Sequence, residues 1–123
     1  MSGPGPAKAT LKGMLKFTGA TGAVIYQEGC FGSASSNPAA TGTGGNSVTH
    51  NGAGSWTIQL DPGQDPTRTL LSGGIDAVGA TGTNEFQMTQ TSATAVDIRT
   101  FSGGVATDKN CWLRVEGLDV PST

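Results

Sequence analysis

Side chains of alternating character fill the stretch from Glu85 to Gly117, and this alternation constrains the fold more than any other feature of the chain. Val96 and Ile98 point to one side of an extended backbone. Asp97 and Arg99 point to the other side. Apolar and polar residues alternate in the same way before and after this segment, with turn residues in between. The stretch therefore predicts three short strands of an antiparallel sheet that has one apolar and one polar face.

Glycine accounts for 20 of the 123 residues, and only 13% of the residues are charged. A chain so rich in turn formers and so poor in lysine and glutamate lacks the residues that favour helices. Its length is typical of a single domain that buries about two-thirds of the surface of the unfolded chain. The sequence thus predicts an all-β fold: one antiparallel, jelly-roll-like β-sandwich of about eight short strands over residues 10–123, with a flexible N-terminal arm over residues 1–9.

The charge balance bears on the possible partners. The formal net charge is −2, so the chain offers no basic surface for nucleic acid or for an anionic membrane. No apolar run approaches the length of a membrane span, and the sequence does not open with a basic and apolar leader. We therefore expect neither nucleic acid nor a membrane as a partner.

Cys30 and Cys111 are the only cysteines of the chain. Without a secretory leader, the favoured interpretation is two reduced, buried thiols with a structural role. The alternative is a disulfide, which would close a long loop and contribute up to about 5 kcal/mol. Sequence alone leaves both interpretations open.

The segment 10–18 alternates like a strand with one side in the core. Leu11, Leu15 and Phe17 share the predicted core side. Two lysines toward water are a common protection for an exposed sheet edge. The opposite side carries Lys12, Met14 and Lys16.

A second strand is predicted over 23–31, where Val24 and Tyr26 share one side and a bulge is expected at Gly29. Tyr26 is interpreted as a core or rim residue, with a ligand platform as the alternative. A strand over 55–60 has the clearest alternation of the first half of the chain. Its inward residues are Trp56, Ile58 and Leu60.

Two segments without periodicity contain prolines. The N-terminal arm holds Pro4 and Pro6, and it is either an unstructured tail or an arm that lies along a neighbouring subunit. The segment 33–46, with Asn37 and Pro38, is the longest predicted loop. Because long loops in compact domains are often functional, this loop is a candidate for contact with a partner.

The residues of a catalytic or metal site do not occur together in the sequence. His50 is the sole histidine and is expected in an exposed turn, so neither a histidine metal site nor a catalytic triad is indicated. The segment 61–66 has two aspartates but lacks the alternating oxygen ligands of a calcium loop. No nucleophile elbow or phosphate loop is present. We predict no enzymatic activity, no cofactor and no metal.

Trp112 lies on the polar side of the last predicted strand, beside Arg114 and Glu116. Tryptophan and arginine are both enriched in subunit interfaces, which favours an interface here. A place in the core of a second sheet and a ligand platform are the alternatives. If the last strands are neighbours, Asp97 and Arg99 can form ion pairs with the charges of the closing strand.

A distinct series of strands and turns begins at Ser47. A strand, a glycine-rich turn and an aromatic-threonine strand fill 47–58, and a second strand fills 95–101. A glycine-containing turn with Asp108 then leads to a closing strand through Val115 and Gly117. This order resembles a family of bacteriophage virion proteins with small jelly-roll or C1q/TNF-like β-sandwich domains, which occur as capsid decoration (cement) proteins and as knobs of tail components.

The resemblance implies a homotrimer that stands on a capsid or a tail part. The leading hypothesis is a virion structural protein, assembled in the host cytoplasm, that decorates the capsid exterior by binding the major capsid protein. One alternative is a carbohydrate- or receptor-binding tail-tip module that uses Tyr26 or Trp112 as a stacking surface. Another is a tail or neck ring subunit. The candidate interface residues are Trp112, Arg114, Tyr26, Pro4, Pro6, Asn37 and Pro38.

Overall fold

A computed structural model describes residues 8–31, 47–76 and 83–119, in which the chain forms strands and turns and no helix. The strands are β1 (Lys8–Phe17), β2 (Val24–Gly29), β3 (Val48–Gly52), β4 (Ser55–Gln59), β5 (Thr69–Ile75), β6 (Asn84–Ser92), β7 (Ala95–Ser102), β8 (Val105–Ala106) and β9 (Cys111–Asp119).

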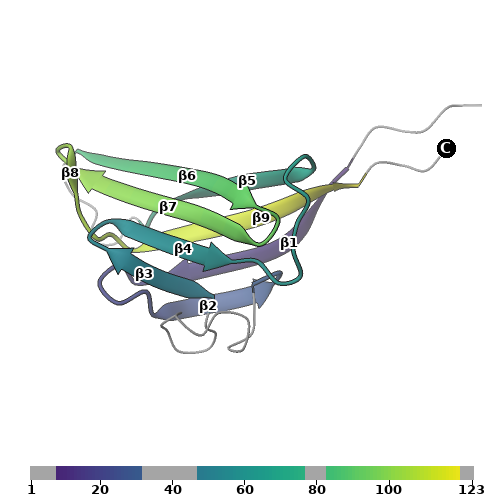
Figure 1. Ribbon diagram of the computed structural model, residues 1–123, viewed down its shortest axis with the longest axis horizontal. Helices are drawn as coiled ribbons and strands as arrows, with labels where there is room; N and C mark the ends of the chain where they lie inside the picture. Colours follow the sequence, from purple (N-terminus) through teal and green to yellow (C-terminus); the bar gives the residue numbers. More distant parts are fainter. Residues whose placement is uncertain (1–7, 32–46, 77–82, 120–123) are drawn as a thin grey trace, which may run out of the picture.

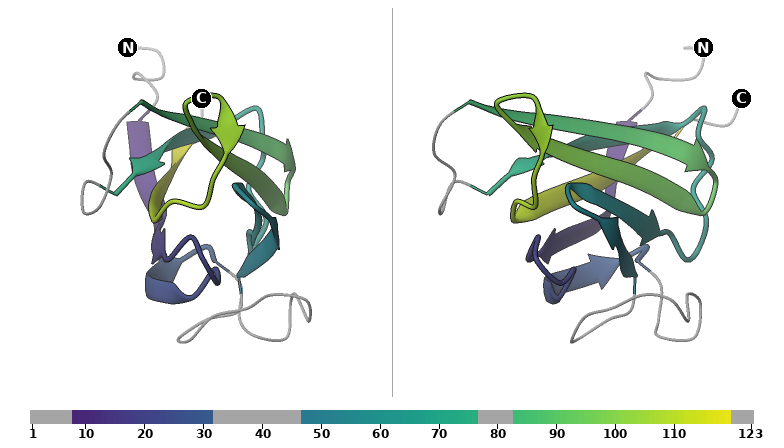
Figure 2. Two further views of the ribbon diagram at one scale, coloured as in Figure 1. Left: turned by 90° about the vertical axis from the view of Figure 1, so that its left-hand side faces the viewer. Right: turned by 60° about the vertical axis from the view of Figure 1, so that its left-hand side comes forward.

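The strands form two antiparallel sheets that pack face to face (Figures 1 and 2). One sheet has the order β2-β1-β9-β5, and the other has the order β3-β4-β7-β6, with β8 pairing to β7. This arrangement confirms the predicted antiparallel β-sandwich. The described residues form nine strands where about eight were expected, because the loop after β7 includes the two-residue strand β8.

The last three long strands do not form one sheet, contrary to the sequence prediction. β6 and β7 pair with each other, whereas β9 lies in the opposite sheet between β1 and β5. The chain crosses from one sheet to the other after β8, through residues 107–110. Asp97 and Arg99 of β7 are therefore in a different sheet from Arg114 and Glu116 of β9. The cross-strand ion pairs required neighbouring strands, and that condition is not met.

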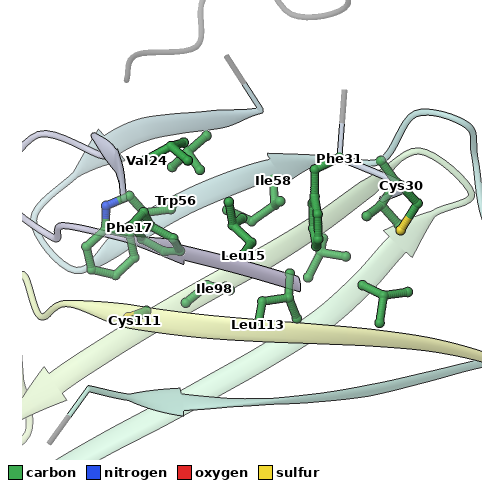
Figure 3. Close-up of a cluster of buried hydrophobic side chains, with 14 residues drawn as sticks. Leu15, Phe17, Val24, Cys30, Phe31, Trp56, Ile58, Ile98, Cys111 and Leu113 are labelled. Atoms are coloured by element: carbon green, nitrogen blue, oxygen red, sulfur yellow. The ribbon is translucent and has the colours of Figure 1, made fainter. Parts of the chain in front are cut away.

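The core lies between the sheets (Figure 3). Trp56, Ile58 and Leu60 are fully buried in it, as predicted. The rings of Trp56 and Phe17 are 5.5 Å apart and tilted by 60°. Trp56 Nε1 donates a hydrogen bond to the carbonyl oxygen of Gly19 at 3.2 Å. The indole thereby satisfies its polar atom while it fills the space between the sheets.

A bulge in β2 moves Tyr26 to the outside of its sheet. Phe17 pairs with Val24 and Lys16 pairs with Tyr26, so Ile25 is the extra residue between the two pairs. The bulge interrupts the period of two, and Val24 is therefore buried while Tyr26 is 46% exposed. The predicted common side for these two residues is wrong, and the register shift lies at Ile25 and not at Gly29.

A second bulge moves Leu11 to the outside. Leu11 pairs with Glu116 and Gly13 pairs with Val115, so Lys12 is the extra residue of β1. Leu11 is 42% exposed in consequence, whereas Leu15 is buried as predicted. Both bulges thus carry a large side chain from the expected core side to the outer side of the same sheet.

Two adjacent glycines in β5 do not break the strand. β5 pairs with β9 throughout, including Gly73 opposite Leu113 and Gly74 opposite Trp112. A side-chain carbon on Gly73 would come 3.1 Å from the Phe86 ring of the other sheet. The glycine therefore lets the facing sheet approach closely.

β1 begins at Lys8, two residues earlier than expected. Lys8 pairs with Asp119 and Ala9 pairs with Leu118, so both residues belong to the sheet and not to the arm. Thr10 donates a hydrogen bond to the Asp119 carboxylate, and this bond, with the nearby Lys12, holds the pKa of that carboxyl below its ordinary value. The predicted arm residues Pro4 and Pro6 and the loop residues Asn37 and Pro38 lie outside the described residues.

Both cysteines are buried and free, which confirms the prediction of two structural thiols. Cys30 and Cys111 lie at opposite ends of the core in Figure 3. Burial, with the carboxylates of Asp108 and Asp76, raises the pKa of the Cys111 thiol from 9.0 to about 12. Burial also raises the pKa of the Cys30 thiol.

The raised pKa of Cys111 predicts a specific loss of stability at high pH. The unfolded thiol loses its proton above pH 9.0, while the folded thiol keeps it up to about pH 12. Its contribution to the free energy of unfolding is therefore complete below pH 9.0 and is lost progressively as the pH rises to about 12.

Urea unfolding of the wild type and of Cys111→Ala across this pH range measures the effect. We expect stability to fall more steeply with pH in the wild type than in Cys111→Ala. Equal slopes would show that Cys111 does not keep its proton on folding. At about pH 8, a thiol reagent should modify neither cysteine in the folded protein and both in the unfolded chain.

Candidate interaction surface

The outer sheet face is the side of the β2-β1-β9-β5 sheet that is turned away from the core. A row of four residues crosses it from strand to strand: Tyr26, Lys16, Trp112 and Gly74. Residues paired in this way point to the same side of the sheet. The structure thus brings Tyr26 and Trp112, two of the predicted interface residues, to one face.

Two further rows extend this face along the strands. Arg114, the third predicted interface residue, lies in the next row, between Met14 of β1 and Ser72 of β5. Among the described residues, five of the six exposed large hydrophobic side chains belong to strands of this sheet. They are Leu11, Met14, Ile25, Tyr26 and Leu70. Apolar side chains gathered on one face are typical of a surface that a partner covers.

A pocket of about 400 Å³ opens on this face between Tyr26 and Trp112. Met14 and Ile75 contribute apolar surface to it, and Lys16 and Asp76 contribute charged groups. The Tyr26–Trp112 pocket, as we call it, is in the size range of small-ligand sites and of pockets that accept a protruding side chain.

Trp112 lies against the backbone of Gly74 in the neighbouring strand. A side-chain carbon on Gly74 would come 3.2 Å from Trp112 Nε1 and 3.6 Å from Cε2. The glycine therefore leaves room for the indole to cover it, an arrangement that also shields the bare backbone of a glycine in a sheet. The position over Gly74 places the indole ring of Trp112 at the wall of the pocket.

Two ion pairs lie on or beside the outer sheet face. Lys16 Nζ and Asp76 Oδ2 are 3.2 Å apart. Arg114 Nε and Glu116 Oε1 are 3.6 Å apart. Pairs this exposed contribute little to stability, but they give the face both signs of charge among its apolar residues. A mixture rich in aromatic side chains, methionine and arginine is the composition of the centre of a protein interface.

Tyr26 is held in place by a local hydrogen bond. Its hydroxyl donates to Glu28 Oε2 at 2.5 Å, two residues along β2. This bond to the carboxylate, and then partial desolvation, raises the pKa of the Tyr26 hydroxyl. The neutral phenol is therefore the form that lies beside the pocket.

Sequence reasoning found only part of this face. It identified Tyr26, Trp112 and Arg114, and it placed Met14 on the correct side of β1. Leu11 was assigned to the core side, because a bulge leaves no clear signal in the alternation. Asp76 was missed, since nothing in the sequence indicates that it lies beside Lys16.

The outer side of the other sheet has a different character. Its hollow, of about 290 Å³, is lined by polar and charged residues, among them Gln87, Asp97 and Arg99. Arg99 is exposed here, as Arg114 is on the outer sheet face. The two faces of the sandwich thus differ in polarity, and the polar face supplies matched control positions.

His50 is a structural residue of β3 and not an exposed turn residue as predicted. Its ring stacks on Trp56 with 5.7 Å between centroids and 24° between planes. His50 Nε2 and Asp108 Oδ1 are hydrogen-bonded at 2.9 Å, and the same oxygen accepts the Gly54 amide at 2.7 Å. Asp108 thereby joins the β3–β4 turn to the segment that leads into β9.

No group of three or more His, Cys, Asp or Glu side chains is placed to hold a metal ion in residues 8–31, 47–76 and 83–119. Over the same residues, no helix is long and apolar enough to cross a membrane. Comparison of the chain with family models, with curated proteins and with solved structures gives no match.

Replacement of Asp108 should destabilise the fold. In Asp108→Ala the Gly54 amide and His50 lose their common acceptor, so we expect the free energy of unfolding to fall by about 1–3 kcal/mol. Urea unfolding measures the loss. Asp97→Ala is the matched control, because Asp97 makes one long contact of 3.4 Å with Thr57 and should change stability by less than about 0.5 kcal/mol. An equal loss in both variants would contradict the role assigned to Asp108.

Proposed function

We propose that this chain is a virion structural protein that decorates a phage capsid. In this proposal it binds the exterior of the shell formed by the major capsid protein, stabilises that shell and associates with copies of itself as a homotrimer. The observation that carries the proposal is the outer sheet face, where exposed apolar side chains lie on the same side of the sheet as Trp112 and Arg114. A protein that acts by assembly needs such a face.

The exposed apolar side chains supply a driving force for assembly. Leu11, Met14, Tyr26 and Leu70 are 37–46% exposed, so each still has apolar area that a partner can remove from water. Association itself costs about 4–15 kcal/mol, so several such contacts on a capsid give firmer attachment than a single one.

The ion pairs of the face also permit contact between copies. Lys16 is paired with Asp76 and Arg114 with Glu116, so no large excess of one sign of charge lies on the face. Like-charge repulsion in a contact made by this face is therefore small. Removal of water from the face leaves each charge with its partner.

Removal of apolar groups from the outer sheet face tests the proposal. In the double variant Tyr26→Ser, Leu70→Ser, we expect self-association and co-sedimentation with capsids to weaken by about tenfold or more, because exposed hydrophobic anchors are lost. The capsids are those of the virus whose genome carries the gene. Analytical ultracentrifugation measures both properties.

Val105→Ser is the matched control for this experiment. Val105 is 66% exposed but lies on β8 of the other sheet, so its loss should leave both properties unchanged. The proposal would be contradicted if the wild-type protein stayed monomeric at high concentration and did not sediment with capsids. An equal effect of the control would show that the outer sheet face is not the contact.

A second candidate function is carbohydrate or receptor binding at a tail tip. One observation favours it: Tyr26 and Trp112 line the same pocket, with a carboxylate and an ammonium group beside them. Aromatic rings can stack on the apolar face of a sugar, while Asp76 and Lys16 offer an acceptor and donors to its hydroxyl groups.

A glycan array separates the two candidates. Binding of a defined glycan that is lost in Tyr26→Ala, with an unchanged melting temperature, would favour the second function. Arg99→Ala, in the polar hollow of the other sheet, is the control and should retain such binding. If the wild type binds no glycan, capsid decoration remains the better proposal.

A further inference from the structure

We propose that the Tyr26–Trp112 pocket binds the segment Pro4–Pro6 of a second copy of the chain. The inference rests on the proposed self-association, and it names the contact that links one subunit to the next. Each copy would then offer one pocket and one proline segment.

The pocket has the geometry of a proline-binding groove. Tyr26 and Trp112 lie on strands separated by β1, so their backbones are about 10 Å apart. Lys16 lies between them, and Met14, in the neighbouring row, adds apolar surface. Grooves between aromatic side chains are a recurrent site for proline-rich segments, whose rings pack against the aromatic faces.

The sequence Gly3-Pro4-Gly5-Pro6 suits this site chemically. Each proline fixes its own φ angle, so less conformational entropy is lost when the segment is bound. Proline also has no backbone N–H that would need an acceptor in an apolar pocket. Small glycines between the prolines let both rings approach the surface.

The segment cannot reach the pocket of its own chain. Pro4 is four residues before Lys8, where β1 begins, so it extends at most about 14 Å beyond that point. The pocket lies at Lys16, eight residues further along β1, which is about 25 Å from Lys8. The prolines that fill it must therefore come from another copy.

The positions of donor and acceptor make the contact directional. The pocket residues Lys16 and Trp112 lie where β1 ends and β9 begins, and the proline segment precedes Lys8 at the opposite end of β1 in the sequence. A head-to-tail contact of this kind closes into a ring when the rotation between copies permits. The homotrimer of the proposed function is one such ring.

Paramagnetic relaxation between copies tests the inference. A spin label on Ser2→Cys of full-length protein is mixed with unlabelled, 15N-enriched wild type. Cys30 and Cys111 do not interfere, because both thiols are buried with raised pKa values. We expect the indole N–H signal of Trp112 and the amide signal of Tyr26 to lose most of their intensity. The buried indole of Trp56 is the internal reference and should lose less.

Two variants complete the test. Pro4→Ala, Pro6→Ala in the labelled copy should abolish the selective broadening, and Trp112→Leu in the enriched copy should weaken association by about tenfold or more, with Trp56 still buried. Absence of selective broadening, or broadening that persists in the double proline variant, would overturn the inference. Selective broadening in a protein that does not bind capsids would support the contact between pocket and proline segment and would contradict capsid decoration. The failure of one proposal can therefore be told from the failure of the other.

Discussion

The contact between Trp56 and Phe17 fixes how the two sheets face one another. Phe17 ends β1 of one sheet, and Trp56 lies within β4 of the other. The indole also donates to Gly19, just beyond β1, so a single residue provides both apolar packing and a directional bond across the core. Because the sheets are held in this relation, the outer sheet face has a stable base, and strands provide every lining residue of its pocket except Asp76, which directly follows β5.

The two outer sides of the sandwich differ in the polarity of their side chains. The face of β2-β1-β9-β5 combines apolar side chains with paired charges, whereas the hollow on the other sheet is lined by glutamine, threonine, aspartate and arginine. An antiparallel sheet can leave one side in water without cost only if that side is polar. The second sheet meets this condition, and the first departs from it in the way that an interface requires.

Alternation predicted the fold class and most of the core, since a period of two is a direct consequence of strand geometry. Trp56, Ile58 and Leu60 were assigned correctly because no bulge interrupts β4. The same rule failed at Leu11 and Tyr26. One extra residue in a strand reverses the predicted inward or outward direction of all side chains beyond the bulge. Pairing between distant strands, such as β9 with β1 and not with β7, was equally inaccessible because it is decided by how the sheets cover each other.

Lys8 and Asp119 are partners in the β1–β9 ladder, so the chain enters and leaves the described sandwich at the same end (Figure 1). Polypeptides joined at these two positions would emerge about 5 Å apart. A unit with adjacent ends can be spliced into a surface loop of a host protein without forcing the ends of that loop apart. The geometry therefore suits this sandwich to insertion into a surface loop of an unrelated protein that presents it.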